Sequence, residues 1–485
     1  MPNLDNIPNL DFMSELPDLS FISAASNYII VIMCVIYAFS SFAVFLPSSR
    51  KRQVKRMDRQ ELFMFIFHFI CYGVLLLQTK QFVVILLYLA QAVFFKMLIF
   101  IYQHVYPECS RIMMNHICFL LLIGFVMLTR LSLEKAIKQF GIVMVASLVA
   151  LVIPIFVEKA YWLKKLRWFY GLAGLLLLAT VFVIGTTKNG STNWISLGGF
   201  AFQPSEFVKI SYVFFIAAML ERARSFKQIF ITAAFCGGHV LVLIMERDLG
   251  GALLYFVVFV FMCYVSTGRM VYLLGGAGAG AVAARVAYEL FGHVRTRFIA
   301  WIDPWSVIDQ QGYQIAQSLF AIGTGGWFGL GLAHGRPGDI PVVESDFIFS
   351  AIAEEFGVFF AICLILIYLS VFLHFITIAT DSEDRFYKLL AYGFSITFIF
   401  QVFLSVGGVT KFIPSTGVTL PLISYGGSSV VSTLMIFAIM QGIFVLTYRI
   451  DDQEEGEDYV ERPAEAADSR YQPEKAARGF LRRNR

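Results

Sequence analysis

Long apolar runs decide what this chain can fold into. An α-helix needs about 20 apolar residues to cross the hydrocarbon core of a bilayer, and thirteen runs in the sequence approach that length. They fall near residues 28–47, 62–78, 82–104, 116–130, 139–157, 169–187, 207–221, 229–246, 249–267, 270–290, 347–374, 388–406 and 428–448. The runs are continuous rather than alternating, which disfavours a transmembrane β-barrel. The pattern predicts an all-α, polytopic membrane protein.

The composition excludes a soluble enzyme. Only 15% of the 485 residues are charged and 58% are hydrophobic, whereas soluble globular chains carry about 25% charged residues. The same hydrophobicity excludes disorder for most of the chain. The seven cysteines have no paired spacing, so we expect neither a disulfide framework nor a zinc site. Nothing in the sequence indicates a nucleic-acid partner.

Positive charges set the expected orientation. Residues 1–49 contain no Lys or Arg, and residues 50–59 contain six. Because cytoplasmic loops are enriched in Lys and Arg, the N-terminus is expected outside and the loop at 50–59 in the cytoplasm. Thirteen helices then place the C-terminus in the cytoplasm. The basic loop is interpreted first as a topology determinant, with anionic membrane lipid as the alternative ligand.

The chain divides into four expected segments. Residues 1–27 form an outer N-terminal segment without the basic stretch of a cleavable signal peptide. Residues 28–115 hold three helices and the basic loop, and residues 116–450 hold ten helices with a large outer loop at 291–346. Residues 451–485 form an acidic and then basic tail that is predicted to be disordered. A solvated tail and a tail that docks an intracellular partner both fit this pattern.

The long outer loop ends on a carboxylate. Asp346 lies where this loop meets the apolar run that starts at Phe347. Ser345 is placed to cap the following helix, and an acid near a helix N-terminus is electrostatically favoured. From the residues alone, a capping role and a chemical role are both open for Asp346.

Two other charged groups lie at predicted helix ends. Glu206 and Lys209 are three residues apart and therefore neighbours on a helix. They form either a plain ion pair or a functional pair, because charges at membrane depth are costly and often functional. Asp248 separates two apolar runs, as a helix break or as a functional residue.

The last outer segment, 407–427, is built from Gly, Pro, Ser and Thr with Lys411 as its single base. Such a backbone exposes N–H groups suited to an anion such as pyrophosphate. A re-entrant loop packed against protein needs the same composition. The composition does not decide between these two interpretations.

At these motifs the sequence resembles the SEDS family (shape, elongation, division and sporulation), whose members include FtsW, RodA and SpoVE. The matching segments are NWISLGGFAFQPSEFVK (193–209), DLGGALL (248–254), DPW followed by QGYQIAQSLFAIGTGGWFGLGL (303–332), ESDFIFSAIAEEFG (344–357) and IPSTGVTLPLISYGGSS (413–429). Their order and spacing match over about residues 116–450, which carry the ten helices expected of the family core. The three helices before residue 116 are additional, and the sequence assigns them no function.

Two positions depart from the family pattern. Asn193 stands where the family usually has Arg. Glu246 and Arg247 stand before Asp248, where the family usually has Gln-Pro. Asp346 matches the catalytic Asp of the family in its Ser-Asp-Phe-Ile context.

The resemblance implies a peptidoglycan glycosyltransferase in the bacterial cytoplasmic membrane. Such enzymes polymerise lipid II on the outer leaflet, in elongation, division or sporulation, with a class B penicillin-binding protein as partner. Asp346 would be the general base on the acceptor 4-hydroxyl. The substrate-binding candidates are Trp194, Glu206, Lys209, Asp248, Arg295, Arg297, Arg336, Lys411 and Ser424. A divalent cation, Mg²⁺ or Mn²⁺, is expected as cofactor, with Glu206 and Asp346 as candidate ligands.

Two other functions are kept as alternatives. A lipid II flippase would use intramembrane charges such as Asp248 for transport, but it needs no base at its outer mouth. A non-catalytic scaffold of the cell-wall machinery predicts that Asp346→Ala leaves growth unaffected. The motifs are shared among the subfamilies, so they do not assign the chain to elongation, division or sporulation.

Overall fold

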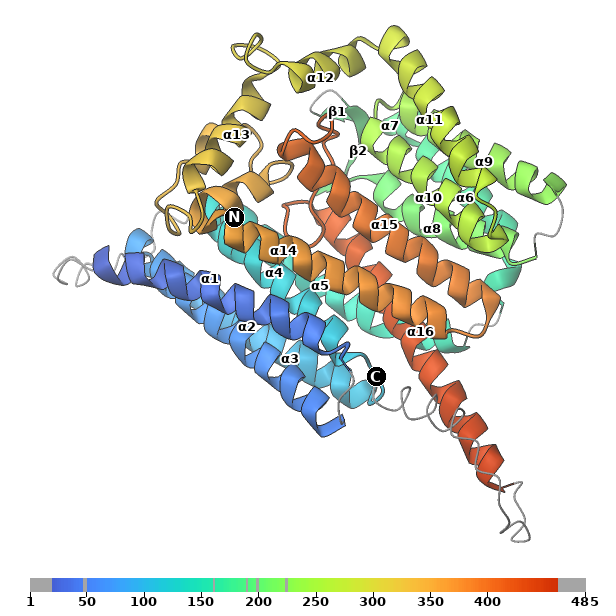
Figure 1. Cartoon of the computed structure of the whole chain (residues 1–485), viewed down its shortest axis with the longest axis horizontal. Helices are drawn as coiled ribbons and strands as arrows, with labels where there is room; N and C mark the ends of the chain where they lie inside the picture. Colours follow the sequence, from blue (N-terminus) through green and yellow to red (C-terminus); the bar gives the residue numbers. More distant parts are fainter. Residues whose placement is uncertain are drawn as a thin grey trace.

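The structure is a computed structural model that describes residues 20–46, 50–159, 162–188, 191–197, 200–222 and 226–460. Within these residues, each of the thirteen predicted runs forms a helix (Figure 1). In chain order they are α1 (Ser20–Ala43), α2 (Arg50–Thr79), α3 (Phe82–Val105), α4 (Arg111–Leu131), α5 (Leu133–Lys159), α6 (Arg167–Ala179), α8 (Pro204–Leu220), α9 (Phe226–Met245), α10 (Leu249–Thr267), α11 (Val271–Leu290), α14 (Ile348–Asp381), α15 (Arg385–Val409) and α16 (Gly427–Val460).

The helices are those of a multi-pass membrane protein. Twelve spans among the described residues are long and apolar enough to cross a bilayer, with α6 counted together with α7 (Val181–Ile184). The thirteenth predicted run is α8, which has 17 residues. It packs against α6, α9, α10, α15 and α16, so it is an inner helix of the bundle.

Two segments differ from the sequence-based expectation. The basic run at 50–59, expected in a loop, forms the first turns of α2, because no Gly or Pro interrupts it. The tail was expected to be disordered from residue 451, but α16 continues to Val460. The rest of the tail (461–485) and most of the N-terminal segment (1–19) lie outside the described residues.

The three additional helices form a layer on one side of the bundle (Figure 1). There α1 packs on α14, while α2 and α3 pack on α4. Polar contacts join the layer to the core: the Tyr37 hydroxyl lies 3.1 Å from Nδ1 of His116, and the Tyr72 hydroxyl lies 2.9 Å from Oγ1 of Thr129. As a result, the membrane span of α4 is buried along its whole length.

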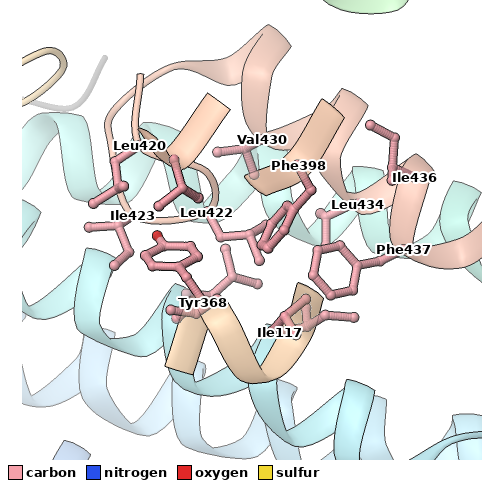
Figure 2. Packing of buried hydrophobic residues seen from close by; sticks show 14 of the residues in the cluster. Ile117, Tyr368, Phe398, Leu420, Leu422, Ile423, Val430, Leu434, Ile436 and Phe437 are labelled. Atoms are coloured by element: carbon pink, nitrogen blue, oxygen red, sulfur yellow. The ribbon is translucent and has the colours of Figure 1, made fainter. Parts of the chain in front are cut away.

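The centre of the core lies where α4, α14, α15 and α16 meet the turn at 420–423. Figure 2 shows Ile117, Tyr368, Phe398 and Phe437 packed around Leu422 and its neighbours. The Tyr368 hydroxyl donates a hydrogen bond of 2.6 Å to the carbonyl of Pro421. The last outer segment is therefore anchored in the core on one side, as a re-entrant loop would be.

The predicted outer loop 291–346 contains two helices, α12 (Gly292–Ile302) and α13 (Tyr313–Gly325), and a short 3₁₀ turn, η4 (Pro337–Asp339). The helix α14 is interrupted at Gly357, where φ is 83°. The segment that follows α13 passes over α14 at this interruption. The carbonyls that the break frees, those of Glu354 and Glu355, accept hydrogen bonds from the backbone N–H groups of Leu330 and Gly331. The segment after α13 is thus fixed by backbone hydrogen bonds to the broken helix.

A small antiparallel sheet, which the all-α prediction did not include, covers the start of α8. Its strands are β1 (Thr186–Lys188), β2 (Ser191–Leu197) and β3 (Phe200–Phe202), in the order β1-β2-β3. The backbone N–H of Thr192 also donates to the carbonyl of Glu246 at the end of α9, at 3.0 Å. The sheet therefore places the start of the 193–209 segment next to the turn between α9 and α10.

Candidate active site

A large cavity opens among the segments that are predicted to lie outside the membrane. Its volume is about 1650 Å³. Its walls come from α5, β2, the α9–α10 turn, α12, the segment before α14 and the 415–429 segment. Segments at 193–203, 296–347 and 415–429 therefore contribute to one hollow, although they are far apart in the sequence.

Asp346 lies on the wall of this cavity. It precedes α14 by two residues, in a turn where its N–H donates to the carbonyl of Val342 at 3.3 Å. Ser345 does not cap α14 as expected: Phe347 is the N-cap residue, and no side chain caps the helix. The Ser345 hydroxyl donates to the Val342 carbonyl instead, at 3.3 Å, because the turn places the helix start beyond its reach.

The turn that carries Asp346 is tied to the last outer segment. The N–H of Tyr425 donates to the carbonyl of Glu344 at 2.7 Å, and the Ser424 hydroxyl donates to the carbonyl of Ser345 at 2.5 Å. Lys135 of α5 pairs with the Glu344 carboxylate. Ser424, a predicted substrate contact, is itself buried and is not among the residues of the cavity wall. Its contacts hold the position of Asp346.

Arg297 of α12 approaches Asp346 across Gly417. A Cβ atom at Gly417 would lie 3.5 Å from Oδ2 of Asp346 and 3.8 Å from Nη2 of Arg297, and φ at this glycine is 71°. Nη1 of Arg297 also donates to the carbonyl of Ser415 at 3.2 Å. Burial raises the pKa of Asp346 above its usual value, while the Ser345 hydrogen bond and the Arg297 charge lower it. The net result is a pKa above the usual value of an aspartate carboxyl group.

Asp248 joins three elements at the cavity wall. Its Oδ1 accepts a hydrogen bond of 2.9 Å from the N–H of Gly251 and so caps α10. Its Oδ2 accepts from Nδ2 of Asn193 in β2 at 3.0 Å, and from Gln203 and Ser205 at the start of α8, each at 3.3 Å. Asn193, which stands where the family usually has Arg, is thus a neutral partner of Asp248.

Glu246 is a buried acid beside this junction. Its side chain is only 1% exposed, and both carboxyl oxygens lack a hydrogen-bond partner within the described part of the chain. Burial, and then the neighbouring charge of Asp248, raise the pKa of Glu246 to about 8. The group is therefore mostly protonated at neutral pH.

The predicted pair Glu206 and Lys209 is present but lies beneath the cavity wall. Nζ of Lys209 lies 2.5 Å from Oε2 of Glu206 and 3.0 Å from Oε1 of Gln401. The Ser432 hydroxyl donates to the same oxygen of Glu206 at 2.8 Å. Gln401 then donates to the carbonyl of Thr419, which lines the cavity. The pair supports the wall from below.

Of the predicted cations, Arg297 is the one that lines the cavity, and Trp194 lines it as well. Arg295 is exposed and lies 3.9 Å from Glu289, and Arg336 is exposed with its backbone N–H bonded to Glu354. Lys411 contributes its carbonyl oxygen, which accepts a hydrogen bond from Trp301.

The cavity wall includes residues that sequence reasoning missed. They are Lys138, Arg247, Gln203, Gln314 and Tyr425. Lys138 precedes an apolar run, where it is indistinguishable from any residue at a helix end. Arg247 carried a signal, because it departs from the family pattern immediately before Asp248.

An apolar face continues from the polar part of the cavity. It consists of Ile142, Val145, Ala146 and Val149 of α5. Val145 and Val149 are 65% and 52% exposed, so this side of the cavity is open to the surroundings of the helix bundle. The site therefore combines a charged mouth with an apolar groove at membrane depth.

The donor set for a divalent cation is only partly present. No group of three or more His, Cys, Asp or Glu side chains within the described residues is arranged to hold a metal ion. Glu206 is engaged by Lys209 and Ser432 and does not line the cavity. Asp346 does line it, so the two predicted ligands do not share one wall.

Comparisons with known proteins agree on one family. A family profile described as cell cycle protein, covering FtsW, RodA and SpoVE, matches residues 110–448. Peptidoglycan glycosyltransferase RodA of Mycobacterium tuberculosis is 37% identical over 313 residues, which are 59% of this chain and 66% of that protein. The match therefore spans slightly less than two thirds of this relative.

Two further matches cover most of the related protein. Probable peptidoglycan glycosyltransferase FtsW of Geobacter sp. is 32% identical, over 66% of this chain and 87% of that protein. A solved chain from a peptidoglycan synthase complex, described as coordinating polymerization and crosslinking, is 27% identical with a TM-score of 0.59. It aligns with 71% of this chain and 99% of its own.

Proposed function

Since the chain belongs to the FtsW, RodA and SpoVE family of cell cycle proteins, we propose that it is a peptidoglycan glycosyltransferase. Its substrate is lipid II, which it polymerises into glycan strands at the outer face of the bacterial cytoplasmic membrane. The names of the mycobacterial and Geobacter relatives support this activity. The observation that carries the proposal is the cavity, in which Asp346 and Arg297 flank Gly417 beside an apolar groove.

The shape of the cavity suits a lipid-linked sugar. A prenyl chain can remain against the apolar face of α5, while the sugar and pyrophosphate occupy the polar mouth. Binding sites for such amphiphiles need an open side, because the tail stays in the bilayer. The exposed valines of α5 provide this opening.

Asp346 is proposed as the general base. It takes the proton of the acceptor 4-hydroxyl as that oxygen bonds to the anomeric carbon of the donor sugar. The bond between this carbon and the pyrophosphate oxygen breaks, and undecaprenyl pyrophosphate leaves. Arg297 stabilises the negative charge that develops on the leaving group.

We also propose a divalent cation as cofactor, but with ligands that differ from those predicted from the sequence. Asp346 and the phosphate oxygens of the substrate would hold it, and Glu206 would not. When bound, Mg²⁺ or Mn²⁺ would stabilise charge on the leaving pyrophosphate. Arg297 would act on the same charge from the protein side.

The proposed partner is a class B penicillin-binding protein, which would cross-link the new strands. The solved relative from a peptidoglycan synthase complex supports such a partner. The proposed orientation has the N-terminus outside and the C-terminus in the cytoplasm, as the distribution of Lys and Arg indicates.

The test is glycan polymerisation by the purified full-length protein. Fluorescent lipid II is supplied with Mn²⁺ or Mg²⁺, with and without the class B partner. Asp346→Asn keeps the size of the side chain and removes the base, so the rate should fall at least about 100-fold. Asp339→Asn is the matched control, because Asp339 is exposed and is not part of the cavity wall; it should keep wild-type activity.

Each other outcome would refute one part of the proposal. Glycan strands that persist in Asp346→Asn would keep the enzyme and refute Asp346 as its base. No strands from folded wild-type protein with its partner would refute the polymerase and lead to a lipid II transport assay. Strands that form equally with and without metal would remove the cation from the proposal.

A further inference from the structure

We propose that a cationic stripe at the start of α2 binds the head group of an anionic glycerophospholipid. The stripe consists of Lys51, Arg52, Lys55 and Arg59, and all four residues are exposed. With the N-terminus outside, as proposed, the stripe faces the cytoplasmic leaflet. It lies in the additional helices, which take no part in the proposed reaction, so the inference does not depend on that reaction.

The length of α2 places the stripe at the level of the lipid head groups. The helix has 30 residues, whereas about 20 are enough to cross the hydrocarbon core of a bilayer. Residues 62–79 are predominantly apolar, so the surplus lies at the basic end. This surplus is about 15 Å of helix, which reaches from the hydrocarbon into the head-group region.

The stripe lies on the lipid-facing side of α2. Lys51, Lys55 and Arg59 are spaced four residues apart and therefore share one face of the helix. Leu62 and Phe69 continue the same face into the apolar part of the helix, and they are 57% and 62% exposed. Because exposed apolar side chains of a membrane helix contact lipid tails, the cations that continue their face lie beside the head groups of the same lipids.

The opposite face of α2 fixes the rotation of the helix. Gln53 and Gln60 are buried, and Nε2 of Gln60 donates to the hydroxyl of Ser41 in α1 at 3.2 Å. The Arg56 guanidinium donates to the carbonyl of Ala43 at the end of α1. These contacts prevent α2 from rotating, so the stripe stays on the exposed side of the helix.

The two acids in this part of α2 already have other partners. Oδ1 of Asp58 lies 2.5 Å from Nη2 of Arg111, and the Glu61 carboxylate pairs with Lys96. Oε2 of Glu61 also lies 3.8 Å from Nη2 of Arg111. None of the four stripe cations forms an ion pair with a residue that the structure describes. The described part of the chain therefore leaves the charge of the stripe unneutralised.

An anion also suits the first turn of α2. This turn is basic and contains no acidic residue, although cations at a helix N-terminus oppose the helix dipole. A phosphate group offsets this repulsion and accepts charge-assisted hydrogen bonds from Lys and Arg. Clusters of Lys and Arg at the cytoplasmic end of a membrane helix attract anionic lipid, with a gain in affinity of about fivefold for each cation.

Lipid preference in mixed micelles tests the inference. Native mass spectrometry of the purified full-length protein gives its relative affinity for phosphatidylglycerol and phosphatidylcholine. The wild type should prefer phosphatidylglycerol, and this preference should weaken as ionic strength rises, because salt screens exposed charges. The triple variant Lys51→Gln, Lys55→Gln and Arg59→Gln should lose at least about tenfold of the preference.

A second triple variant is the matched control. It removes three exposed cations near the ends of α8, α9 and α10 that lie away from the cavity: Arg222→Gln, Lys227→Gln and Arg269→Gln. Its net charge changes by the same amount as that of the first variant. The control should keep the wild-type preference for phosphatidylglycerol.

A role in membrane insertion alone would give a different result. Charges that only set the orientation of α2 act while the chain inserts, and a micelle has no sides. The first triple variant would then keep the wild-type preference, which would overturn the inference. If thermal unfolding shows that this variant does not fold, Lys55→Gln alone should lose about fivefold, and an unchanged preference would again refute the lipid site.

Two further results would overturn the inference. In the first, both triple variants lose the preference equally, which would show a general effect of net charge. In the second, phosphatidylglycerol binds only after residues 451–485 are removed, which would make the acidic tail the occupant of the stripe.

Discussion

At the scale of single residues, the sequence located the charged groups but not the direction in which they face. The sequence allows Asp248 to be either a helix break or a functional residue. In the structure it caps α10 and also lies on the cavity wall. Ser424, a predicted substrate contact, is buried against the backbone of Ser345. An irregular segment has no periodicity from which its buried side can be read.

Glu246 gives a pH-dependent prediction at this scale. Its pKa is raised from 4.5 to about 8 in the folded protein, so the folded state holds a proton that the unfolded state has lost between these values. Stability therefore falls as pH rises through this window, by at most about 1.4 kcal/mol per pH unit. Glu246→Gln should remove this loss, and its gain in melting temperature over the wild type should grow from pH 5 to pH 8.

The measurement is thermal unfolding in detergent at several pH values. Asp339→Asn removes an exposed carboxylate and should follow the wild-type pH dependence. A Glu246→Gln protein whose melting temperature differs from wild type by a constant amount at every pH would show that Glu246 is not protonated in the fold.

At the scale of elements, hydrophobic runs predicted every membrane helix but not the break inside one of them. The run 347–374 reads as continuous, yet α14 is interrupted at Gly357. The interruption is stabilised by the segment after α13, whose backbone N–H groups reach the freed carbonyls. Such a partner lies about 25 residues away in the chain, so no local pattern reveals it.

Gly329 is one of the glycines on which this crossing depends. A Cβ atom there would lie 2.2 Å from the carbonyl oxygen of Glu355, and φ is 80°. Gly329→Ala should therefore destabilise the protein by about 3 kcal/mol, through overlap and backbone strain together. Thermal unfolding in detergent measures the loss.

Gly338 provides a matched control in the same outer layer. A Cβ atom at Gly338 would meet nothing within 4 Å. Gly338→Ala should leave the melting temperature close to that of the wild type. Equal melting temperatures for the two alanine variants would mean that the chain does not cross α14 at the break.

At the scale of the whole molecule, hydrophobicity predicted the thirteen runs that form helices within the described residues. The family motifs separated a ten-helix core from three additional helices. The contacts between the core and the additional helices could not be predicted, because the sequence does not show which residues the polar side chains inside an apolar run will contact. In the structure, α4 is covered by the additional layer and carries three polar side chains that contact it: Asn115, His116 and Thr129.

Removing residues 1–109 tests whether the stability of the core depends on the additional helices that cover α4. The truncated chain should still insert, because a solved relative aligns over 99% of its length with 71% of this chain. Its melting temperature should fall by several degrees, since each polar group left without a partner costs about 1–3 kcal/mol. Thermal unfolding of both proteins in the same detergent provides the comparison.

An apolar replacement on α4 distinguishes lost polar contacts from lost packing. Thr129→Val should raise the melting temperature of the truncated chain, in which the Thr129 hydroxyl has lost Tyr72, and should lower that of the full chain. A replacement that acts in the same direction on both would show that the layer does not serve as a polar partner of α4.

The groove along α5 also has a pharmacological consequence. A compound that competes for this cavity must combine an anionic head group with a hydrophobic tail, because the polar part of the cavity adjoins the exposed valines of α5. Such a compound arrives by dissolving in the bilayer first. Its potency will therefore scale with its partition coefficient and with the amount of lipid in the assay, so inhibitors should be ranked by mole fraction in the membrane.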